Sequence, residues 1–418
     1  MKISSPFSFV CFGILFVFIS CKNDVKKEEN ITSEEKKIAL QYFANPVTGI
    51  SELPNLFSNG NELFLSWTEE KDSLSILYFS KFKNEKWSPS EEITSGKDWF
   101  VNWADFPAIV ENNGNILTNI LQKSSPDTYS YDVKLNLFNS EEKKWNSNFM
   151  LHNDGTKSEH GFVSMVPYND SFFVTWLDGR NTGGGHEGHD HNESAGAMTL
   201  RGAVVGVDGS ITSENELDAK VCDCCQTSTA LSSQGPVVVY RDRSDKEIRD
   251  ISIVRWADST WSQPKTVVAD NWDIEGCPVN GPAVAAFEDN LAVAWFTGKD
   301  EKPKVQITFS NDGGKSFDTP IRVDSNTTLG RVDVAMLSQE SAVISWMEVV
   351  DQETFIRLKK IYANGSKGEV ITISGTSSAR ASGFPKIAIV KDFVYIAWTQ
   401  INGKQSSIQT ARISLDNL

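Results

Sequence analysis

Leu291-Ala-Val-Ala-Trp295, Ala342-Val-Ile-Ser-Trp346 and Val394-Tyr-Ile-Ala-Trp398 are three copies of one short apolar strand that ends in tryptophan. Related strands occupy residues 63–67, 116–120, 172–176 and 237–240. The last four copies end at positions 240, 295, 346 and 398, so they lie 55, 51 and 52 residues apart. A period near 50 residues with turn residues between short strands suits a four-stranded unit. The sequence predicts an all-β fold, a seven-bladed β-propeller, with six blades as the alternative if the unit around 105–120 is irregular.

The two ends of the repeat array predict how the ring closes. The seventh unit runs out at Leu418 after three strands, and the apolar segment 38–43 stands unassigned before the first unit. Pairing of these segments would complete the last blade and remove two exposed sheet edges. We therefore assign residues 38–418 to one propeller domain.

The N-terminus has the pattern of an export signal. Residues 7–20 form a short apolar run, below the roughly 20 residues that a membrane-spanning helix needs. The run ends Phe18-Ile19-Ser20-Cys21, which resembles the lipobox of bacterial lipoproteins, in which the cysteine is lipidated. This resemblance implies a signal peptide at 1–20 and a lipid on Cys21, with ordinary secretion as the alternative. We expect an extracytoplasmic protein anchored to the bacterial cell envelope.

Residues 21–37 are rich in Lys, Glu, Asn and Ser and lack apolar periodicity, which predicts a flexible tether. Within it, Lys27-Glu28-Glu29 resembles the acidic signals of outer-membrane surface lipoproteins. The formal net charge of −15 argues against nucleic acid as a partner, because nucleic acid requires a basic face. The membrane would be contacted only through the N-terminal lipid.

One turn carries a resemblance to a known family. Ser310-Asn-Asp312-Gly-Gly314-Lys-Ser-Phe317 resembles the Asp-box of the sialidase-like (BNR) repeat proteins and falls between a third and a fourth strand. In that family Ser and Asp cap the hairpin, glycine permits a positive φ and the aromatic residue packs between sheets. The motif implies a sialidase-like propeller fold, not an activity.

Sialidase activity itself is not expected. Sialidases bind a carboxylate with three arginines and use a tyrosine nucleophile paired with glutamate. The first arginine lies in a Phe/Tyr-Arg-Ile-Pro motif, and here the corresponding stretch is Ser51-Glu52-Leu53-Pro54, where glutamate would repel a carboxylate. Another glycosidase, a lyase or a glycan-binding module stays possible on residues placed at the expected channel mouth, which are Asp178, Arg180, Arg241, Asp242, Arg331 and Arg380. Asp178, Arg180, Arg241 and Asp242 would serve equally well as ion pairs between blades.

Cysteine and histidine gather at the same expected mouth. Cys222, Cys224 and Cys225 open the fourth unit, Cys277 opens the fifth and His160 opens the third. A glycine-rich insertion beside them carries three of the five histidines, His186, His189 and His191. These residues predict a site for a soft or borderline metal, copper before zinc. Disulfides are the alternative in an oxidising compartment, and a redox-active thiol pair is a third reading.

The sequence therefore favours an envelope lipoprotein whose propeller binds a metal at a Cys/His-rich mouth. A carbohydrate-active enzyme or glycan-binding module of sialidase-like type is the first alternative. A scaffold for other envelope proteins is the second, because a propeller fold alone does not define a function.

Overall fold

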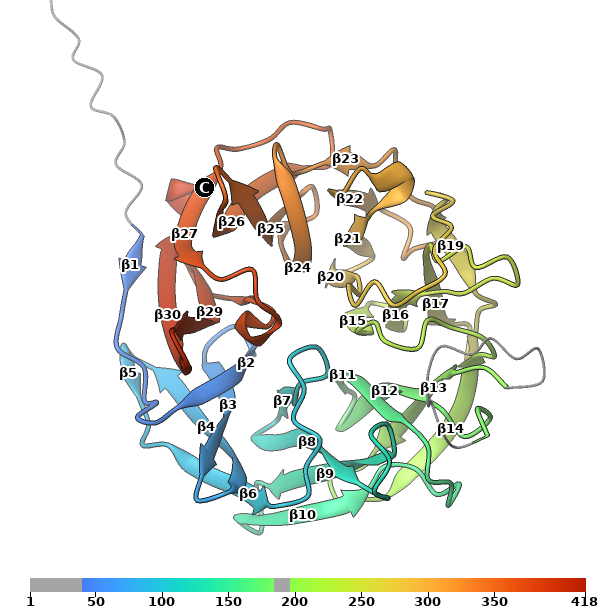
Figure 1. The fold of residues 1–418 in the computed structure, drawn as a ribbon, viewed down its shortest axis with the longest axis vertical. Helices are drawn as coiled ribbons and strands as arrows, with labels where there is room; N and C mark the ends of the chain where they lie inside the picture. Colours follow the sequence, from blue (N-terminus) through green and yellow to red (C-terminus); the bar gives the residue numbers. More distant parts are fainter. Residues whose placement is uncertain (1–39, 184–195) are drawn as a thin grey trace, which may run out of the picture. The chain divides into compact units, whose positions relative to one another are not determined.

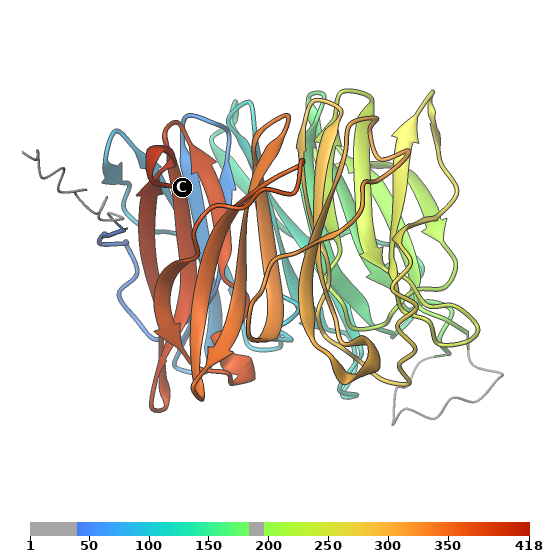
Figure 2. The ribbon, with the colours of Figure 1, turned by 90° about the horizontal axis from the view of Figure 1, so that it is seen from above.

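The structure is a computed structural model, and it describes residues 40–183 and 196–418. These residues form seven antiparallel sheets arranged around a common centre, as Figure 1 shows, and the strands of each sheet run through the thickness of the ring in the side view of Figure 2. The seven-bladed β-propeller expected from the repeat is confirmed. The irregular unit that could have reduced the count to six is a complete four-stranded blade.

The first three blades follow one another along the chain. Blade 1 contains β2 (Ser51–Ser58), β3 (Leu63–Lys71), β4 (Leu74–Lys83), β5 (Lys86–Trp87) and β6 (Glu91–Gly96). Blade 2 contains β7 (Ile109–Asn112), β8 (Asn115–Lys123), β9 (Tyr131–Asn139) and β10 (Lys144–Met150). Blade 3 contains β11 (His160–Tyr168), β12 (Ser171–Asp178), β13 (Thr199–Val205) and β14 (Ile211–Asp218).

The remaining blades continue the same order. Blade 4 contains β15 (Ser228–Ser232), β16 (Gly235–Arg241), β17 (Ile251–Ala257), β18 (Thr260–Trp261) and β19 (Lys265–Val268). Blade 5 contains β20 (Ala283–Phe287), β21 (Asn290–Thr297), η1 (Lys299–Glu301), β22 (Lys304–Ser310) and β23 (Ile321–Arg322). Blade 6 contains β24 (Thr327–Ser338), β25 (Ser341–Val350), β26 (Glu353–Tyr362) and β27 (Ile371–Thr376). Blade 7 contains β28 (Lys386–Val390), β29 (Phe393–Asn402), β30 (Gln405–Ser414) and β1 (Gln41–Tyr42), with η2 (Arg380–Ser382) before it and η3 (Leu415–Asn417) after it.

The tryptophan-ended repeat strands are the second strands of the blades. They are fully covered because each blade packs against its neighbours on both faces, and the ring's core is built from them. All five of the repeat tryptophans are at most 1% exposed, namely Trp67, Trp176, Trp295, Trp346 and Trp398. Their burial explains why aromatic residues recur at this position.

The ring closes as the sequence predicts. β1 pairs with β30 in antiparallel register, with Gln41 opposite Arg412 and Tyr42 opposite Ala411. Phe43, which follows β1, packs its ring against Phe82 and Tyr395 at centroid distances of 5.4 and 5.8 Å. The N-terminal strand thus ties blade 7 to blade 1 and covers the outer edge of the last sheet.

The Asp-box lies in the turn between β22 and β23. Ser310 Oγ accepts from the Gly314 amide at 2.9 Å, and Asp312 Oδ1 accepts from the Ser316 amide at 2.9 Å. Gly314 has a φ of 83°, which glycine adopts without strain. Phe317 packs against the core between the sheets. The motif is a structural turn in this chain.

Several sequence expectations lie outside the described residues. They are the signal peptide at 1–20, the expected lipidation of Cys21, the tether at 21–37, and His186, His189 and His191 in the insertion. Within the described part of the chain, no helix is long and apolar enough to cross a membrane.

Candidate functional site

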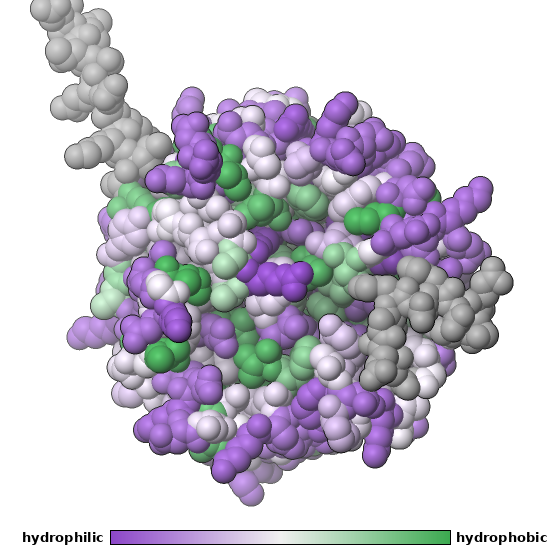
Figure 3. Space-filling model, viewed as in Figure 1, coloured by the Kyte–Doolittle hydropathy of each residue, from purple (hydrophilic) through white to green (hydrophobic). Residues whose placement is uncertain are grey.

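The starts of the inner strands and the ends of the second strands share one face of the ring. His160 at the start of β11 is paired with Asp178 at the end of β12, and Ser51 is paired with Glu69 in the same way. Loops that precede several inner strands enclose a pocket of about 500 Å³ near the channel. It is lined by Phe100, Asn102, Trp103, Ala104, Tyr129, Tyr131, Glu159, Phe162, Asp223, Cys224, Cys277, Val279 and Arg380. Figure 3 shows one face of the ring, which is hollowed at its centre, with hydrophobic and hydrophilic residues both present around the hollow.

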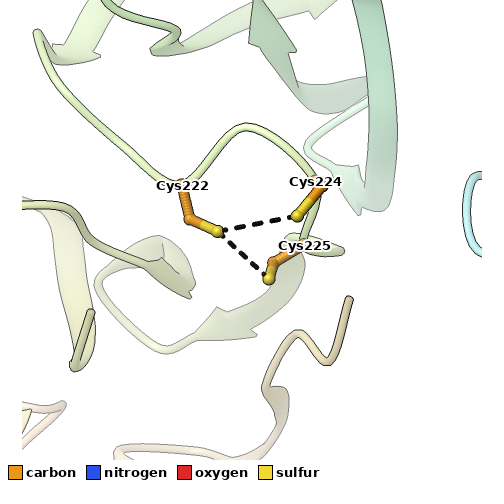
Figure 4. Close-up of side chains that lie close together, drawn as sticks. All are labelled: Cys222, Cys224 and Cys225. Atoms are coloured by element: carbon orange, nitrogen blue, oxygen red, sulfur yellow. Dashed lines mark hydrogen bonds between the residues drawn. The ribbon is translucent and has the colours of Figure 1, made fainter. Parts of the chain in front are cut away.

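Three cysteines converge in the loop that leads into β15 (Figure 4). The Sγ atom of Cys222 lies 3.3 Å from that of Cys225 and 4.0 Å from that of Cys224. The loop is held from both sides, because the Cys222 amide donates to the Arg241 carbonyl at 3.0 Å and the Val221 amide donates to the Met198 carbonyl at 2.9 Å. The thiols therefore meet on a backbone fixed between blades 3 and 4.

One arginine places positive charge on the cluster. Arg249, 2% exposed, donates from Nη1 to the Cys222 Sγ at 3.3 Å and from Nη2 to Glu247 at 2.8 Å. Burial opposes ionisation of Cys222, but hydrogen bonds from Cys224 and Cys225 and the charge of Arg249 hold the pKa of this thiol well below its usual value. The cluster is thus built to carry one thiolate on Cys222.

The other thiols complement that charge. Hydrogen bonding to Cys222 raises the pKa of Cys224, and burial raises the pKa of Cys225. Cys277 is exposed, and a hydrogen bond from Cys224 lowers its pKa. These four are the cysteines of the described residues, and all of them are free thiols. The structure therefore does not contain the disulfides that the sequence offered as an alternative. Cys224 and Cys277 both line the pocket, which gives the cluster access to solvent.

A buried tyrosine and two carboxyl groups lie at the side of the pocket. The Tyr131 hydroxyl is 2.6 Å from Glu159 Oε1 and 3.4 Å from Asp105 Oδ2. Burial raises the pKa of Glu159 well above its usual value and raises that of Asp105 to about 7. Gly161 allows this approach, since a Cβ there would collide with Asp105 Oδ2. Both carboxyl groups therefore keep their protons to a higher pH than ordinary acidic side chains do.

Two of the arginines expected at a ligand site are instead structural ties. Arg241, 2% exposed, donates to the carbonyls of Asn280, Arg249 and Phe296 at 2.7–3.2 Å. Arg331 donates to carbonyls of the loop before blade 7 and to Ser382 Oγ at 2.8 Å, and its guanidinium lies 4.9 Å from the Trp103 ring centroid. Both side chains hold neighbouring blades together, because their donors are taken up by backbone acceptors.

The other four polar candidates divide between ion pairing and the pocket. Asp178 forms a bidentate ion pair with Arg180, in which Nε donates to Oδ1 and Nη2 donates to Oδ2, each at 2.7 Å. Asp242 accepts from Ser252 Oγ at 2.9 Å and from the Arg243 amide. Arg380, exposed in η2, is the one candidate of the six that lines the 500 Å³ pocket. The structure thus does not bring the six residues together as one ligand site.

His160 is not grouped with the cysteines and belongs to a separate cluster of possible metal ligands. Its ring stacks on that of His152 at a centroid distance of 3.7 Å, and its Nε2 lies 3.2 Å from Asp154 Oδ2. His152 and Asp154 lie in the loop after β10, which sequence reasoning did not connect with the mouth. The spacing His152-x-Asp154 ahead of His160 was the available signal.

Sequence reasoning also missed the aromatic wall of the pocket. Residues 98–106, Asp-Trp-Phe-Val-Asn-Trp-Ala-Asp-Phe, link blades 1 and 2 and carry Phe100, Trp103 and Asp105. The density of aromatic residues in a connecting segment was the signal, since loops without a core to cover rarely hold so many.

Comparison with known proteins gives a fold and no family. No family model matches this sequence, and no curated protein matches it. Among solved structures, an ulvan lyase described as a new polysaccharide lyase family is 10% identical, with a TM-score of 0.54 over 90% of this chain and 95% of its own. An α-L-arabinanase from Penicillium chrysogenum complexed with arabinobiose is 10% identical, with a TM-score of 0.46 over 91% of this chain and 97% of its own. The NanB sialidase of Streptococcus pneumoniae is 12% identical, with a TM-score of 0.43 over 90% of this chain and 70% of its own.

At these identities the similarity concerns the fold alone, and of these three structures the ulvan lyase has a TM-score above 0.5. The chain shares a β-propeller fold with this carbohydrate-active protein. Any function must come from the residues of this chain's own site.

Proposed function

We propose that this protein binds a soft or borderline metal ion, Cu(I) before Zn(II), through Cys222, Cys224, Cys225 and Cys277 at the mouth of the propeller channel. The observation that carries the proposal is the convergence of three Sγ atoms, with separations of 3.3 and 4.0 Å at Cys222. These separations are far longer than the S–S bond of about 2.05 Å in a disulfide.

The sulfur spacing fits metal coordination. For thiolates about 2.3 Å from a tetrahedral metal, neighbouring sulfur atoms are about 3.8 Å apart, which lies between the two observed distances. Sulfur ligands select Cu(I) and Zn(II) over harder ions. Arg249 supports the proposal because it offsets the negative charge that a second or third thiolate would add.

The position of the ligands indicates how a metal would enter. Cys222 and Cys225 are 1% exposed, whereas Cys224 is half-buried and Cys277 is exposed. A metal held by the two deep sulfurs would be reached from the pocket across the two shallow ones. Such an arrangement suits uptake and transfer of an ion more than a closed structural site.

The test is metal analysis of the full-length chain expressed in the periplasm, together with a count of free thiols. We expect one Cu(I) ion per chain at the cysteines, with the thiols protected. Cys222→Ser should abolish binding, and Cys277→Ser should weaken it by about 10–100-fold because three thiols remain. Cys222 and Cys225 are the deep pair, so Cys225→Ser should match Cys222→Ser. A chain without stoichiometric metal and without free thiols would refute the proposal.

A second candidate is a carbohydrate ligand in the same pocket. Phe100, Trp103 and Tyr129 provide aromatic surface and Arg380 a cation, which suits a sugar chain carrying acidic groups. The Tyr131–Glu159 contact at 2.6 Å is also the residue pairing that sialidases use for catalysis, although the arginine motif of that family is absent. The fold neighbour is named an ulvan lyase, so ulvan belongs in the test panel.

Binding and turnover separate this candidate from the metal. Ulvan, arabinan and sialosides would be offered to the full-length protein, and binding should fall by about 10-fold or more in Arg380→Gln and Tyr129→Ala. Tyr131→Phe should retain binding and lose turnover if the chain is an enzyme. Absence of binding and turnover with every polysaccharide would exclude this candidate and leave the metal proposal untouched.

We also propose export as a lipoprotein anchored to the cell envelope, on the basis of residues 1–21. Cys21→Ser should move the protein from the membrane fraction to the soluble fraction and abolish labelling by a fatty acid. Persistence in the membrane fraction would contradict the lipid anchor.

A further inference from the structure

A second group of metal-ligand side chains lies between blades 2 and 3, apart from the cysteines. It consists of His160 at the start of β11, Asp178 at the end of β12, and His152 and Asp154 in the loop after β10. The side chains of His160, Asp178, His152 and Asp154 are 0%, 0%, 2% and 6% exposed. Polar groups buried this deeply need partners.

The tautomer of His160 follows from its neighbours. Its Nδ1 lies 3.2 Å from the Ser158 carbonyl and 3.3 Å from the Tyr131 carbonyl, and because carbonyl oxygens only accept, this nitrogen carries hydrogen. In the neutral ring Nε2 is then a bare lone pair. It faces Asp154 Oδ2 at 3.2 Å and Asp178 Oδ1 at 3.7 Å, and it has no hydrogen-bond partner.

A lone pair that faces two carboxylate oxygens in the protein interior is unfavourable unless a cation lies between them. The neighbouring ring does not supply one. His152 Nδ1 already contacts Asp154 Oδ2 at 2.8 Å, and two protonated imidazoles stacked 3.7 Å apart would repel each other. Arg180 places a guanidinium on Asp178, with Nε 2.7 Å from Oδ1, but no donor among the described residues faces His160 Nε2 itself.

The nearby arginines do not balance the local charge. Arg180 Nη2 is shared among Asp178 at 2.7 Å, Glu214 at 3.0 Å and Asp154 at 3.6 Å. Arg201 contacts Glu214 at 3.2 Å and Glu216 at 2.9 Å, and Asp132 lies 3.7 Å from His152 Nε2. Four carboxylates, those of Asp154, Asp178, Glu214 and Glu216, thus share two guanidinium groups, and a fifth, Asp132, lies beside His152.

We propose that His160 Nε2, Asp154 Oδ2 and Asp178 Oδ1 form a second metal site. It would bind a divalent cation that accepts nitrogen and oxygen ligands, such as Mn(II) or Zn(II). The three atoms lie within 4.8 Å of one another. Ligands about 2.1 Å from a tetrahedral metal are about 3.4 Å apart, which lies between the distances of 3.2 and 3.7 Å at Nε2. His152 acts as a positioning residue that orients Asp154.

Mn(II) is the probe of choice because it prefers nitrogen and oxygen ligands and leaves the thiolate cluster empty. Mn(II) would be titrated into the full-length chain, and the free ion would be measured by its electron paramagnetic resonance signal. The titration should show one saturable site per chain. His160→Gln and Asp154→Asn should each weaken binding by at least about 100-fold, and His152→Gln by about 10–100-fold. Near-ultraviolet circular dichroism of each metal-free variant establishes that it is folded.

Two further variants locate the ion. The chain with His186, His189 and His191 all replaced by glutamine should bind Mn(II) with unchanged affinity, and so should Cys222→Ser. The absence of a saturable site would overturn the proposal. Binding that survives in folded Asp154→Asn and His160→Gln, or that disappears with the three insertion histidines, would overturn it as well.

Discussion

Asp105 provides a quantitative test of the electrostatics beside the pocket. Its side chain is 2% exposed and Oδ1 accepts from the Phe162 amide at 2.7 Å. Burial raises the pKa of this carboxyl to about 7, whereas an ordinary aspartate has a value of 3.8. Between these two values the folded protein keeps a proton that the unfolded chain releases, so stability is lost as the pH rises.

The size of the effect follows from the pKa difference. About three pKa units at about 1.36 kcal/mol each give a total loss of about 4 kcal/mol, of which about 2–3 kcal/mol falls between pH 5 and pH 8. Asp105→Asn removes the titration and keeps an oxygen that can accept from Phe162. The free energy of unfolding of the variant, relative to the parent, should therefore rise by about 2–3 kcal/mol from pH 5 to pH 8.

Urea denaturation at pH 5, 6, 7 and 8 measures this difference. Asp208→Asn is the matched control, because Asp208 is an exposed carboxylate whose pKa is lowered by its bonds to Ser210. The control should show no gain in stability between pH 5 and pH 8. If the difference between Asp105→Asn and the parent were the same at every pH, the carboxyl would be ionised in the folded protein throughout, and the argument would fail.

Three further outcomes follow from the fold and the cluster. Phe43→Ala should lower the free energy of unfolding by about 2–3 kcal/mol in a denaturant titration, since a partly buried ring that joins blades 7 and 1 is lost. Arg331→Met should cost about 3–5 kcal/mol and leave metal and polysaccharide binding unchanged; a selective loss of binding would instead make Arg331 a ligand residue. Arg249→Gln should raise the pKa of the Cys222 thiol by about 1 unit, seen as a shift of thiolate absorbance with pH, because the adjacent cation is removed. An unshifted titration would show that the neighbouring thiols alone stabilise the thiolate.

The fold could be predicted because its signal is repeated. Each sequence marker is only four or five residues long, but seven related markers at a spacing near 50 define the blades. Closure by β1 followed from counting strands, since the last unit lacked one. In a tandem repeat each unit packs against its neighbours in the chain, so the order of the repeats predicts contacts that a sequence pattern ordinarily does not reveal.

The cysteine cluster could also be placed, because a blade start fixes where its loop lies on the ring. The roles of the arginines could not be predicted from the sequence. Arg331 has a φ of 55° beside register shifts in β24, and that backbone turns its guanidinium into the blade interface. His160 was assigned to the correct face, but the direction of its ring depends on the carbonyls of Tyr131 and Ser158, which no sequence pattern reveals.

The two proposed metal sites are distinguished by donor chemistry. The sulfur set lies before blades 4 and 5 with Arg249 beside it, and the nitrogen and oxygen set lies between blades 2 and 3 with Arg180 beside it. Because ligand softness governs selection, the first set favours Cu(I) while the second favours Mn(II) or Zn(II). Arg249 offsets negative charge at the first set, whereas Arg180, shared among three carboxylates, offsets only part of it at the second. The propeller supplies this arrangement because every blade contributes an independent loop to one face, and neighbouring loops can differ in chemistry while the strands beneath them stay the same.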